Sequence, residues 1–422
     1  MNQFEITHIE SGEILDSRGD PTVMATVGLA SGAKSAAAVP SGASVGAFEA
    51  HELRDENPDR YNGKGVIKAC SNINVRIAKE LIGEDAQDQE RIDRIMVRLD
   101  GTDNKSKLGA NAILAVSLAV SRAVSVARSI PLHASLQKTF NLKKSETQTI
   151  PIMNLVNGGM HGDTNLAIQE FQIIPIKGES ISKRIETASE LFHSLADELK
   201  KNKLDSDVGN EGGYSPDVES LEDIFHMLGS IVIDAGLTPG EDILFGIDAA
   251  ANSFYDKSKK TYTLSPPSRD LSASELREQY EKWIHKFHIS SIEDPFYEEA
   301  WDDWKSFSSS KSINNTLVIG DDLIATNKNR LKKAIKEKSI NAVLVKPNQI
   351  GTLSETIEVI KLAQKHNLAV VISHRSGETN DTFISDLAVG VGAEYLKAGA
   401  PSRGERVAKY NRLMEIEKEL NT

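Results

Sequence analysis

Charged and polar residues recur at the ends of short apolar runs throughout the C-terminal half of the chain. They are Asp248, Glu293, Asp321, Lys346, the stretch Ser373 to Ser376, and Lys397. From Glu293 onward the intervals are about 24 to 28 residues, the length of one strand plus one helix in a βα unit. Because a βα barrel gathers the carboxyl ends of its strands around one opening, we expect these distant residues to share a pocket. The spacing therefore predicts an α/β fold built on a barrel.

The length of the chain leaves room for a second, smaller domain. A barrel of about 250 residues accounts for just over half of the 422 residues. The N-terminal part shows strand-like and then helical periodicity. The predicted strands cover 6–15, 22–29 and 35–39, and the predicted helices cover 65–82, 88–99 and the residues from 109 onward. With the polar run 141–149 as a linker, we predict an N-terminal α+β domain over 1–140 and a β/α barrel over 150–422.

Beyond the linker, short apolar runs alternate with helical patterns, as a barrel requires. The predicted barrel strands include 152–153, 171–175, 243–247, 291–292, 317–319, 342–345, 369–372 and 395–396. The serine-rich stretch 306–312 is predicted to be a loop.

Charge and targeting features narrow the classes of partner. The formal net charge of -12 argues against nucleic acid as a partner, because phosphate backbones select basic surfaces. The longest apolar stretch, 110–127, contains Asn111 and Arg122 and is rich in alanine, which favours a buried helix over membrane insertion. The N-terminus shows no signal peptide and Cys70 is the single cysteine, so we expect a cytoplasmic protein without an intrachain disulfide.

Three carboxylates end or follow predicted strands, namely Asp248, Glu293 and Asp321. Any one of them is equally well explained as a helix N-cap. Three that converge on one pocket would repel one another strongly unless a divalent ion neutralised them. Oxygen ligands without nearby cysteine or histidine favour Mg²⁺ over Zn²⁺. The three residues are therefore candidate magnesium ligands.

Lys346 follows the apolar run 342–345 and should end inside the barrel opening. A lysine there is either the partner in a structural ion pair or a reactive amine. To act as a base it must lose its proton part of the time, and we expect nearby Mg²⁺ and partial desolvation to lower its pKa. The spacing favours the catalytic interpretation.

Two further segments supply candidate binding groups. The hydroxyls and arginine of Ser373 to Ser376 form a good clamp for phosphate or carboxylate, although an ordinary loop with a surface arginine would look the same. Lys397 adds positive charge to the same rim. Glu211 stands among glycines and suits a general acid opposite Lys346, with a flexible surface loop as the alternative. The small-residue loop 40–46 is of the kind that closes over a site.

Together these motifs resemble the enolase family, and the resemblance covers essentially the whole chain. The most specific motifs are Ser-Ile-Glu-Asp-Pro-Phe at 291–296, Gly-Asp-Asp-Leu at 320–323, Asn-Gln-Ile-Gly-Thr-Leu at 348–353 and Ser-His-Arg-Ser-Gly-Glu-Thr at 373–379. The resemblance implies a barrel whose second strand runs antiparallel, capped by the N-terminal domain. It also implies a homodimer or higher homo-oligomer.

The resemblance implies Mg²⁺-dependent, reversible dehydration of 2-phosphoglycerate to phosphoenolpyruvate, a step of glycolysis and gluconeogenesis. Lys346 would remove the C2 proton and Glu211 would assist loss of the C3 hydroxyl. Two Mg²⁺ ions per active site are implied, the first held by Asp248, Glu293 and Asp321, the second with help from Ser44. Among the substrate-binding residues, Arg375 and Ser376 would hold the phosphate, Lys397 the carboxylate, and His161, Gln169 and Glu170 would line the site.

A few positions depart from the family pattern and keep other functions open. Asn210 stands where the family normally has aspartate, Val45 replaces the usual threonine, and Pro347 replaces valine or phenylalanine. One alternative is therefore an enolase-like paralogue that acts on a related phospho- or phosphono-carboxylate. Another is a scaffold or surface-binding role, with a surface or secreted pool that needs no signal peptide.

Overall fold

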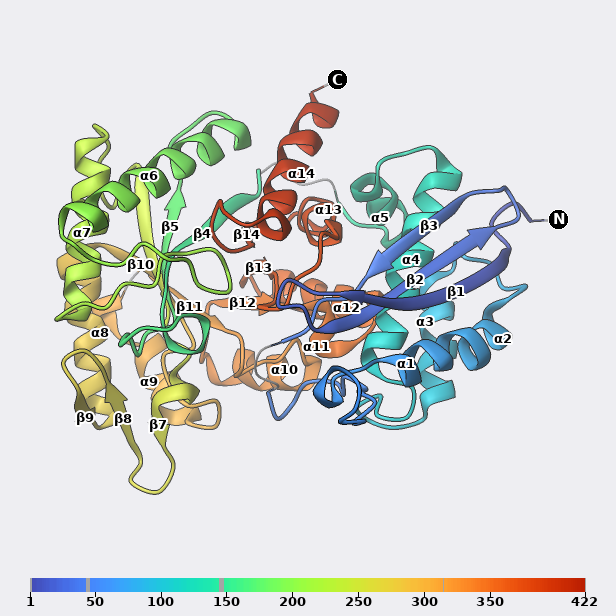
Figure 1. Cartoon of the computed structure of the whole chain (residues 1–422), viewed down its shortest axis with the longest axis horizontal. Helices are drawn as coiled ribbons and strands as arrows, with labels where there is room; N and C mark the ends of the chain where they lie inside the picture. The colour runs from blue at the N-terminus through green and yellow to red at the C-terminus, as the bar shows by residue number, and fades with distance from the viewer. Residues whose placement is uncertain (1, 43–45, 144–147, 314, 422) are drawn as a thin grey trace.

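The structure is a computed structural model that describes residues 2–42, 46–143, 148–313 and 315–421. Figure 1 shows a barrel on one side and, on the other, a small sheet with helices packed against it. The last helix of the small domain, α5, ends at Phe140, and the first barrel strand, β4, begins at Ile150. Where one domain ends and the next begins stays a prediction.

The N-terminal sheet is antiparallel, with the order β1-β2-β3. Its strands are β1 (Ile6–Leu15), β2 (Pro21–Leu29) and β3 (Lys34–Ala38), within one residue of the predicted ranges. The helices that pack against it are α1 (Ile67–Ser71), α2 (Ala78–Leu81), α3 (Gln89–Asp100), α4 (Ala110–Arg128) and α5 (Leu132–Phe140). The helix predicted over 65–82 is divided by a π-helical turn, Asn72–Ile77, between α1 and α2.

Helix α4 is the central helix of this domain and is long and apolar enough, by length and composition, to cross a membrane. Within the fold, 83% of its most apolar window is buried. It packs against β2, β3 and the neighbouring helices. Burial in a protein core therefore accounts for its hydropathy.

Eight strands close into the barrel, in the order β10-β11-β12-β13-β14-β4-β5-β6. They are β4 (Ile150–Asn157), β5 (Glu170–Pro175), β6 (Ile243–Asp248), β10 (Ile289–Glu293), β11 (Leu317–Gly320), β12 (Ala342–Val345), β13 (Ala369–Ser373) and β14 (Tyr395–Lys397). Strand β5 runs antiparallel to both β4 and β6, whereas the other neighbours are parallel. The predicted fold class, including the reversed second strand, is confirmed.

Along each barrel strand, apolar side chains point alternately into the barrel and outward toward the helices. The inward-facing side chains form a separate apolar cluster, Ile152, Ile174, Ile319, Ala342, Leu344 and Val371. The outward-facing side chains join the main core beneath the surrounding helices. These helices are α6 (Ile181–Lys201), α7 (Leu221–Asp234), α8 (Ala273–Phe287), α9 (Trp301–Ser308), α10 (Lys328–Glu337), α11 (Pro347–Ile350), α12 (Leu353–Lys365), α13 (Phe383–Val391) and α14 (Gly404–Leu420). A small sheet of β7 (Tyr255–Asp256), β8 (Thr261–Leu264) and β9 (Arg269–Leu271) precedes α8.

The prediction of a loop over 306–312 is wrong in its first part. Helix α9 runs to Ser308, and Lys311–Ile313 form a 3₁₀ turn. Trp304 and Phe307 are fully buried on one side of α9, so packing of its apolar face outweighs the weak helix preference of serine.

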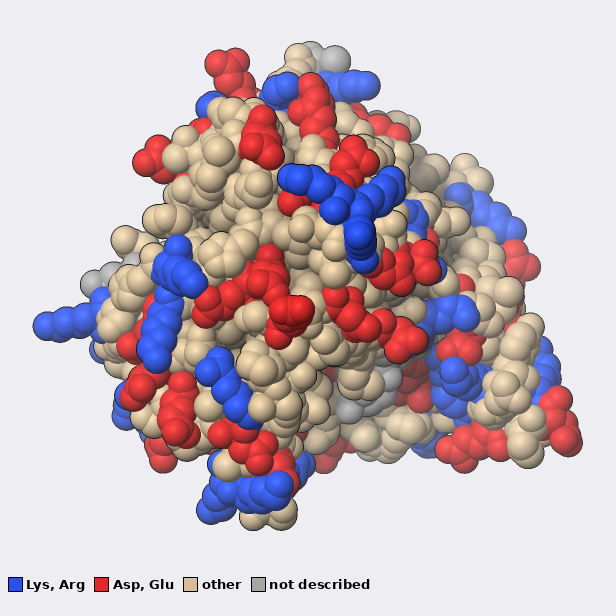
Figure 2. Space-filling view, turned by 60° about the vertical axis from the view of Figure 1, so that its left-hand side comes forward, with Lys and Arg blue, Asp and Glu red and all other residues tan. Residues whose placement is uncertain are grey.

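On the face of the molecule drawn in Figure 2, basic side chains lie among acidic ones.

Glu417 on α14 ties the last helix to the start of α6. Its carboxylate accepts hydrogen bonds from the backbone N–H and the hydroxyl of Ser182, at 3.0 and 2.6 Å, and from the N–H of Ile181. Burial works to raise the pKa of Glu417, but these hydrogen bonds outweigh burial, and the pKa lies below its usual value. The carboxylate therefore satisfies donors at a helix N-terminus that have no partner within the helix.

Glu417→Gln is expected to lower the free energy of unfolding by about 1–3 kcal/mol at pH 7. Because the folded-state pKa is lowered, the contribution is complete above the unfolded pKa of about 4.3 and disappears as pH falls through the folded-state pKa. Urea unfolding at pH 7 and at lower pH measures the difference. Glu415→Gln, at a more exposed position of α14, serves as a control and should change stability little. An equal loss for Glu417→Gln at every pH would contradict the role of its charge.

Candidate active site

A cavity of about 410 Å³ opens at the carboxyl ends of the barrel strands, facing the N-terminal domain. Most of the predicted site residues line it: His161, Gln169, Glu170, Glu211, Asp248, Asp321, Lys346, Arg375, Ser376 and Lys397. Glu293 lies beside the cavity, where it contacts Lys397. The remaining predicted residue, Ser44, lies outside the described residues, as does Val45.

Strand register explains why acidic residues meet here. Asp248 pairs in register with Glu293 on β10 and with Glu170 on β5. Asp248 and Glu293 end their strands, whereas Glu170 begins its own. Because β5 runs antiparallel to its neighbours, its first residue lies at their carboxyl ends. The reversed strand thus adds a third carboxylate to the same level of the barrel.

Lys397 is the shared counter-ion of these three carboxylates. Its Nζ lies 3.1 Å from Glu170 Oε1, 3.1 Å from Asp248 Oδ2 and 2.7 Å from Glu293 Oε2. Burial would lower the pKa of Lys397, but the carboxylates, Asp248 first, outweigh burial and raise it well above its usual value. The sequence interpretation placed this charge on the rim, whereas the structure buries it among acids.

One lysine does not fully balance this acidic group. Among the described residues, the buried Oε1 of Glu293 has no hydrogen-bond partner. Burial, and then repulsion from Asp248, raises the pKa of Glu293 well above its usual value. A buried carboxylate with an unsatisfied oxygen beside a second acid fits a site for a divalent cation.

Lys346 forms an ion pair with Asp321 at the ends of β12 and β11. Gln349 Nε2 donates a hydrogen bond to the other Asp321 oxygen at 2.9 Å. Burial opposes ionisation of both partners, but their attraction outweighs it: the pKa of Asp321 is lowered and that of Lys346 is raised. The pKa of Lys346 is raised because the ammonium has a carboxylate partner, and the lowering expected from nearby Mg²⁺ stays a prediction.

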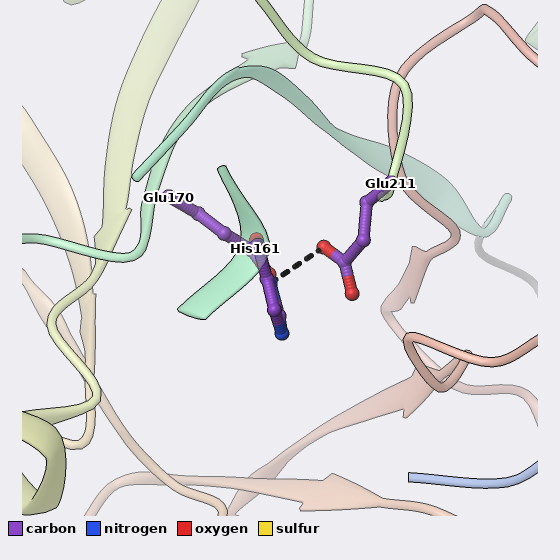
Figure 3. A group of neighbouring side chains, drawn as sticks. All are labelled: His161, Glu170 and Glu211. Atoms are coloured by element: carbon purple, nitrogen blue, oxygen red, sulfur yellow. Dashed lines mark ion pairs between the residues drawn. The ribbon is translucent and has the colours of Figure 1, made fainter. Parts of the chain in front are cut away.

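Glu211 lies at the other side of the cavity, in the loop between α6 and α7. Its Oε2 is 3.2 Å from His161 Nδ1 (Figure 3), and Asn154 Nδ2 donates to the same oxygen at 3.2 Å. Burial opposes ionisation, but His161 and then His374 outweigh it and hold the pKa of Glu211 well below its usual value. Gly212 has φ +88°, and a Cβ there would lie 2.8 Å from the carbonyl oxygen of Ser402, so this turn requires glycine.

The comparison with known families agrees with this geometry. Residues 6–136 match the model described as the N-terminal domain of enolase, and residues 145–422 match that of the enolase C-terminal TIM barrel domain. The chain belongs to the enolase family. Membership indicates an enzyme of the lyase or isomerase type, and the acidic groups in the cavity fit the divalent metal binding of such a family.

The close groups of possible metal ligands in this enolase-family site differ from the trio expected from the sequence. In the described part of the chain, the sets of three with ligand atoms within 4.8 Å are His161, Glu170 and Glu211, and Asp294, Asp321 and Asp322. Asp294 accepts hydrogen bonds from the backbone N–H of Asp321 and of Asp322, at 3.0 and 2.8 Å, so it orients that loop. Burial, then Asp321, raises the pKa of Asp322 to about 7. Two pairs of adjacent acidic residues in the sequence, 293–294 and 321–322, were the signal that could have indicated this additional group of carboxylates.

Sequence reasoning also missed the partner of Arg375. Glu49, from the N-terminal domain, lies 2.8 Å from Arg375 Nη1, and Glu49 Oε1 accepts the N–H of Gly46 at 3.0 Å. Residues 41 and 377 form an isolated β-bridge beside this pair. The N-terminal domain therefore holds the loop that carries Arg375 and Ser376. No local pattern in the sequence indicates the Glu49 contact.

Proposed function

We propose that this enolase-family chain catalyses the reversible, Mg²⁺-dependent dehydration of 2-phosphoglycerate to phosphoenolpyruvate and water. The observation that carries the proposal is that an amine, Lys346, and a carboxyl group, Glu211, line one cavity together with Arg375 and Ser376. The substrate requires such a set: a base at C2, an acid at the C3 hydroxyl, and donors for a phosphate.

In this reaction Lys346 Nζ takes the C2 proton, and Glu211 gives a proton to the departing C3 hydroxyl, which leaves as water. Arg375 and Ser376 bind the phosphate, and Lys397 offers its ammonium to the substrate carboxylate. His161, Gln169 and Glu170 line the remaining wall. The C2 proton beside a carboxylate is very weakly acidic, so the site must stabilise the additional negative charge that develops.

We further propose two Mg²⁺ ions, the first held by Asp248, Glu293 and Asp321 and the second with the help of Ser44. When bound, Mg²⁺ would supply positive charge that offsets the negative charge developing on the substrate carboxylate as the C2 proton leaves. The unsatisfied Glu293 Oε1 supports the first position. Asp321 would have to divide its oxygens between the ion and Lys346, which would weaken the ion pair that keeps Lys346 protonated.

The pKa shifts of Lys346 and Glu211 oppose the protonation that dehydration needs. The pKa of Lys346 is raised, which favours the ammonium, and that of Glu211 is lowered, which favours the carboxylate. Dehydration requires the neutral amine and the protonated acid. Engagement of Asp321 by a metal ion would favour the neutral form of Lys346, whereas Glu211 would need a proton before it acts.

Formation of phosphoenolpyruvate from 2-phosphoglycerate, followed by ultraviolet absorbance, tests the proposal. With millimolar Mg²⁺ we expect steady turnover, and with excess chelator we expect a fall of at least about 100-fold that added Mg²⁺ reverses. Ca²⁺, a larger ion with the same charge, serves as the control for charge alone and should support less turnover. Equal rates with chelator and with Mg²⁺ would contradict the metal requirement.

The same assay addresses the paralogue suggested by Asn210. That residue is exposed, and its backbone carbonyl accepts a hydrogen bond from Arg406 at 3.1 Å, a contact available to any residue type. We therefore expect Asn210→Asp to change turnover of 2-phosphoglycerate little. Negligible turnover in the native chain that Asn210→Asp restores would favour a different phospho- or phosphono-carboxylate.

A further inference from the structure

Arg406 is a fully buried guanidinium at the start of α14, behind the cavity. Its Nη1 lies 2.8 Å from His374 Nδ1 and donates to the carbonyl of Arg375 at 2.6 Å. Its Nη2 donates to the carbonyls of Ser376 at 2.6 Å and Asn210 at 3.1 Å. One side chain thus joins the loop that carries the anion-binding groups to the residue that precedes Glu211.

The contact with His374 determines where the imidazole carries its proton. A guanidinium has five N–H donors and no acceptor, and it stays protonated in proteins. His374 Nδ1 must therefore accept, which leaves the single proton of a neutral imidazole on Nε2. Burial, against the opposing effect of Glu211, holds the pKa of His374 well below its usual value, and Arg406 adds to this lowering. The ring is therefore neutral.

The Nε2 atom of His374 faces the catalytic side of the cavity. It lies 3.5 Å from Glu211 Oε1, and His374 lines the cavity wall. Within the described part of the chain, this buried nitrogen has no hydrogen-bond partner at normal geometry. The other Glu211 oxygen already accepts from Asn154. A proton on Nε2 is thus available to Glu211 Oε1 after a small movement, whereas a lone pair there would repel the carboxylate.

We propose that Arg406 is a positioning residue that fixes His374 in the Nε2–H tautomer and so aims an N–H donor at Glu211. This inference rests on the proposed function, in which Glu211 gives its proton to the leaving hydroxyl. A fixed donor at Oε1 holds the Glu211 carboxyl group in one orientation. Arg406 acts only through His374 and the loop carbonyls, and does not line the cavity itself.

The tautomer can be measured without substrate, by ¹⁵N NMR of the Mg²⁺-loaded protein labelled at histidine nitrogens. The signals of His374 are those lost in His374→Gln. We expect the proton on Nε2 in the native chain at pH 7. A proton on Nδ1, or an imidazolium with both nitrogens protonated, would overturn the proposal even if dehydration of 2-phosphoglycerate were observed. Conversely, absence of that activity would leave the tautomer result standing.

Variants distinguish a specific effect of Arg406 on the His374 tautomer from a general loosening of the loop. Arg406→Lys keeps a donor without an acceptor and should keep the Nε2–H tautomer, whereas the amide of Arg406→Gln can accept, so the Nδ1–H form should appear. Lys409→Gln is the matched control: Lys409 is a fully buried cation of the same helix that donates to Glu378 and to the Thr379 carbonyl. In Lys409→Gln, the tautomer of His374 should be the same as in the native chain. A tautomer unchanged in Arg406→Gln, or changed equally in Lys409→Gln, would overturn the role of Arg406.

Turnover gives a second readout. Arg406→Gln should lower kcat by about 10- to 100-fold with little change in KM, because Glu211 is then no longer held in the orientation that reaches the C3 hydroxyl. Arg406→Lys should recover most of that loss. A loss confined to KM would count against the proposal.

Discussion

Lys346→Ala is expected to reduce turnover of 2-phosphoglycerate by about 10³-fold or more, since it removes the group that takes the C2 proton. The same variant should lose the exchange of that proton with solvent deuterium, followed by NMR of 2-phosphoglycerate in D₂O. Both losses have one cause, because exchange and dehydration begin with the same proton transfer. The fold should remain, since Lys346 follows β12 and the buried residues of that strand are unchanged.

The control must account for removal of a buried lysine. Lys346 pairs with Asp321, and deleting one partner of a buried pair leaves the other charge without its partner. Lys105→Ala also removes a buried lysine, but outside the cavity, where Lys105 pairs at 3.0 Å with the partly exposed Glu355. We expect it to lower stability while turnover stays near the native value. Substantial turnover in Lys346→Ala at saturating Mg²⁺ would contradict the assignment of the base.

Much of the site follows from strand ends alone. Asp248, Glu293 and Lys397 each terminate an apolar run in the sequence, and each terminates a barrel strand in the structure. Their meeting needed only the closure of a barrel, since the register pairs Asp248 with Glu293 directly. Glu170 is different: it begins its strand, and it reaches the same level because β5 is reversed. Periodicity carries no information on strand direction, so only the family resemblance indicated it.

Contacts between distant segments were beyond sequence reasoning. Glu49 and Arg375 are separated by 326 positions, and Arg406 reaches His374 across 32. Neither Glu49 nor Arg406 stands at a strand end, so no spacing rule selects them. The pKa of Lys346 shows the same limit for electrostatics: burial and charge compete, and the sign of the shift depends on an ion pair formed only in the folded protein.

Glu211→Gln is expected to slow dehydration by about 10²- to 10⁴-fold, because an amide of the same shape cannot give a proton to the C3 hydroxyl. Exchange of the C2 proton with solvent should persist, since Lys346 is intact. Dehydration is followed by absorbance of phosphoenolpyruvate and exchange by NMR in D₂O, on the same preparation.

Lys346→Ala and Glu211→Gln therefore serve as controls for one another. Loss of both steps in Glu211→Gln would mean that Glu211 acts on the C2 proton or on substrate binding, and not on the hydroxyl. Unchanged dehydration would assign the acid to another group, and His161, 3.2 Å from Glu211, would be the nearest candidate. Exchange without dehydration would instead place the two proton transfers on two different residues, because removal of the hydroxyl then fails after the C2 proton has already left. That separation follows from the positions of the two residues, because Lys346 directly follows β12 and Glu211 lies in the loop after α6, so they reach the cavity from different parts of the barrel.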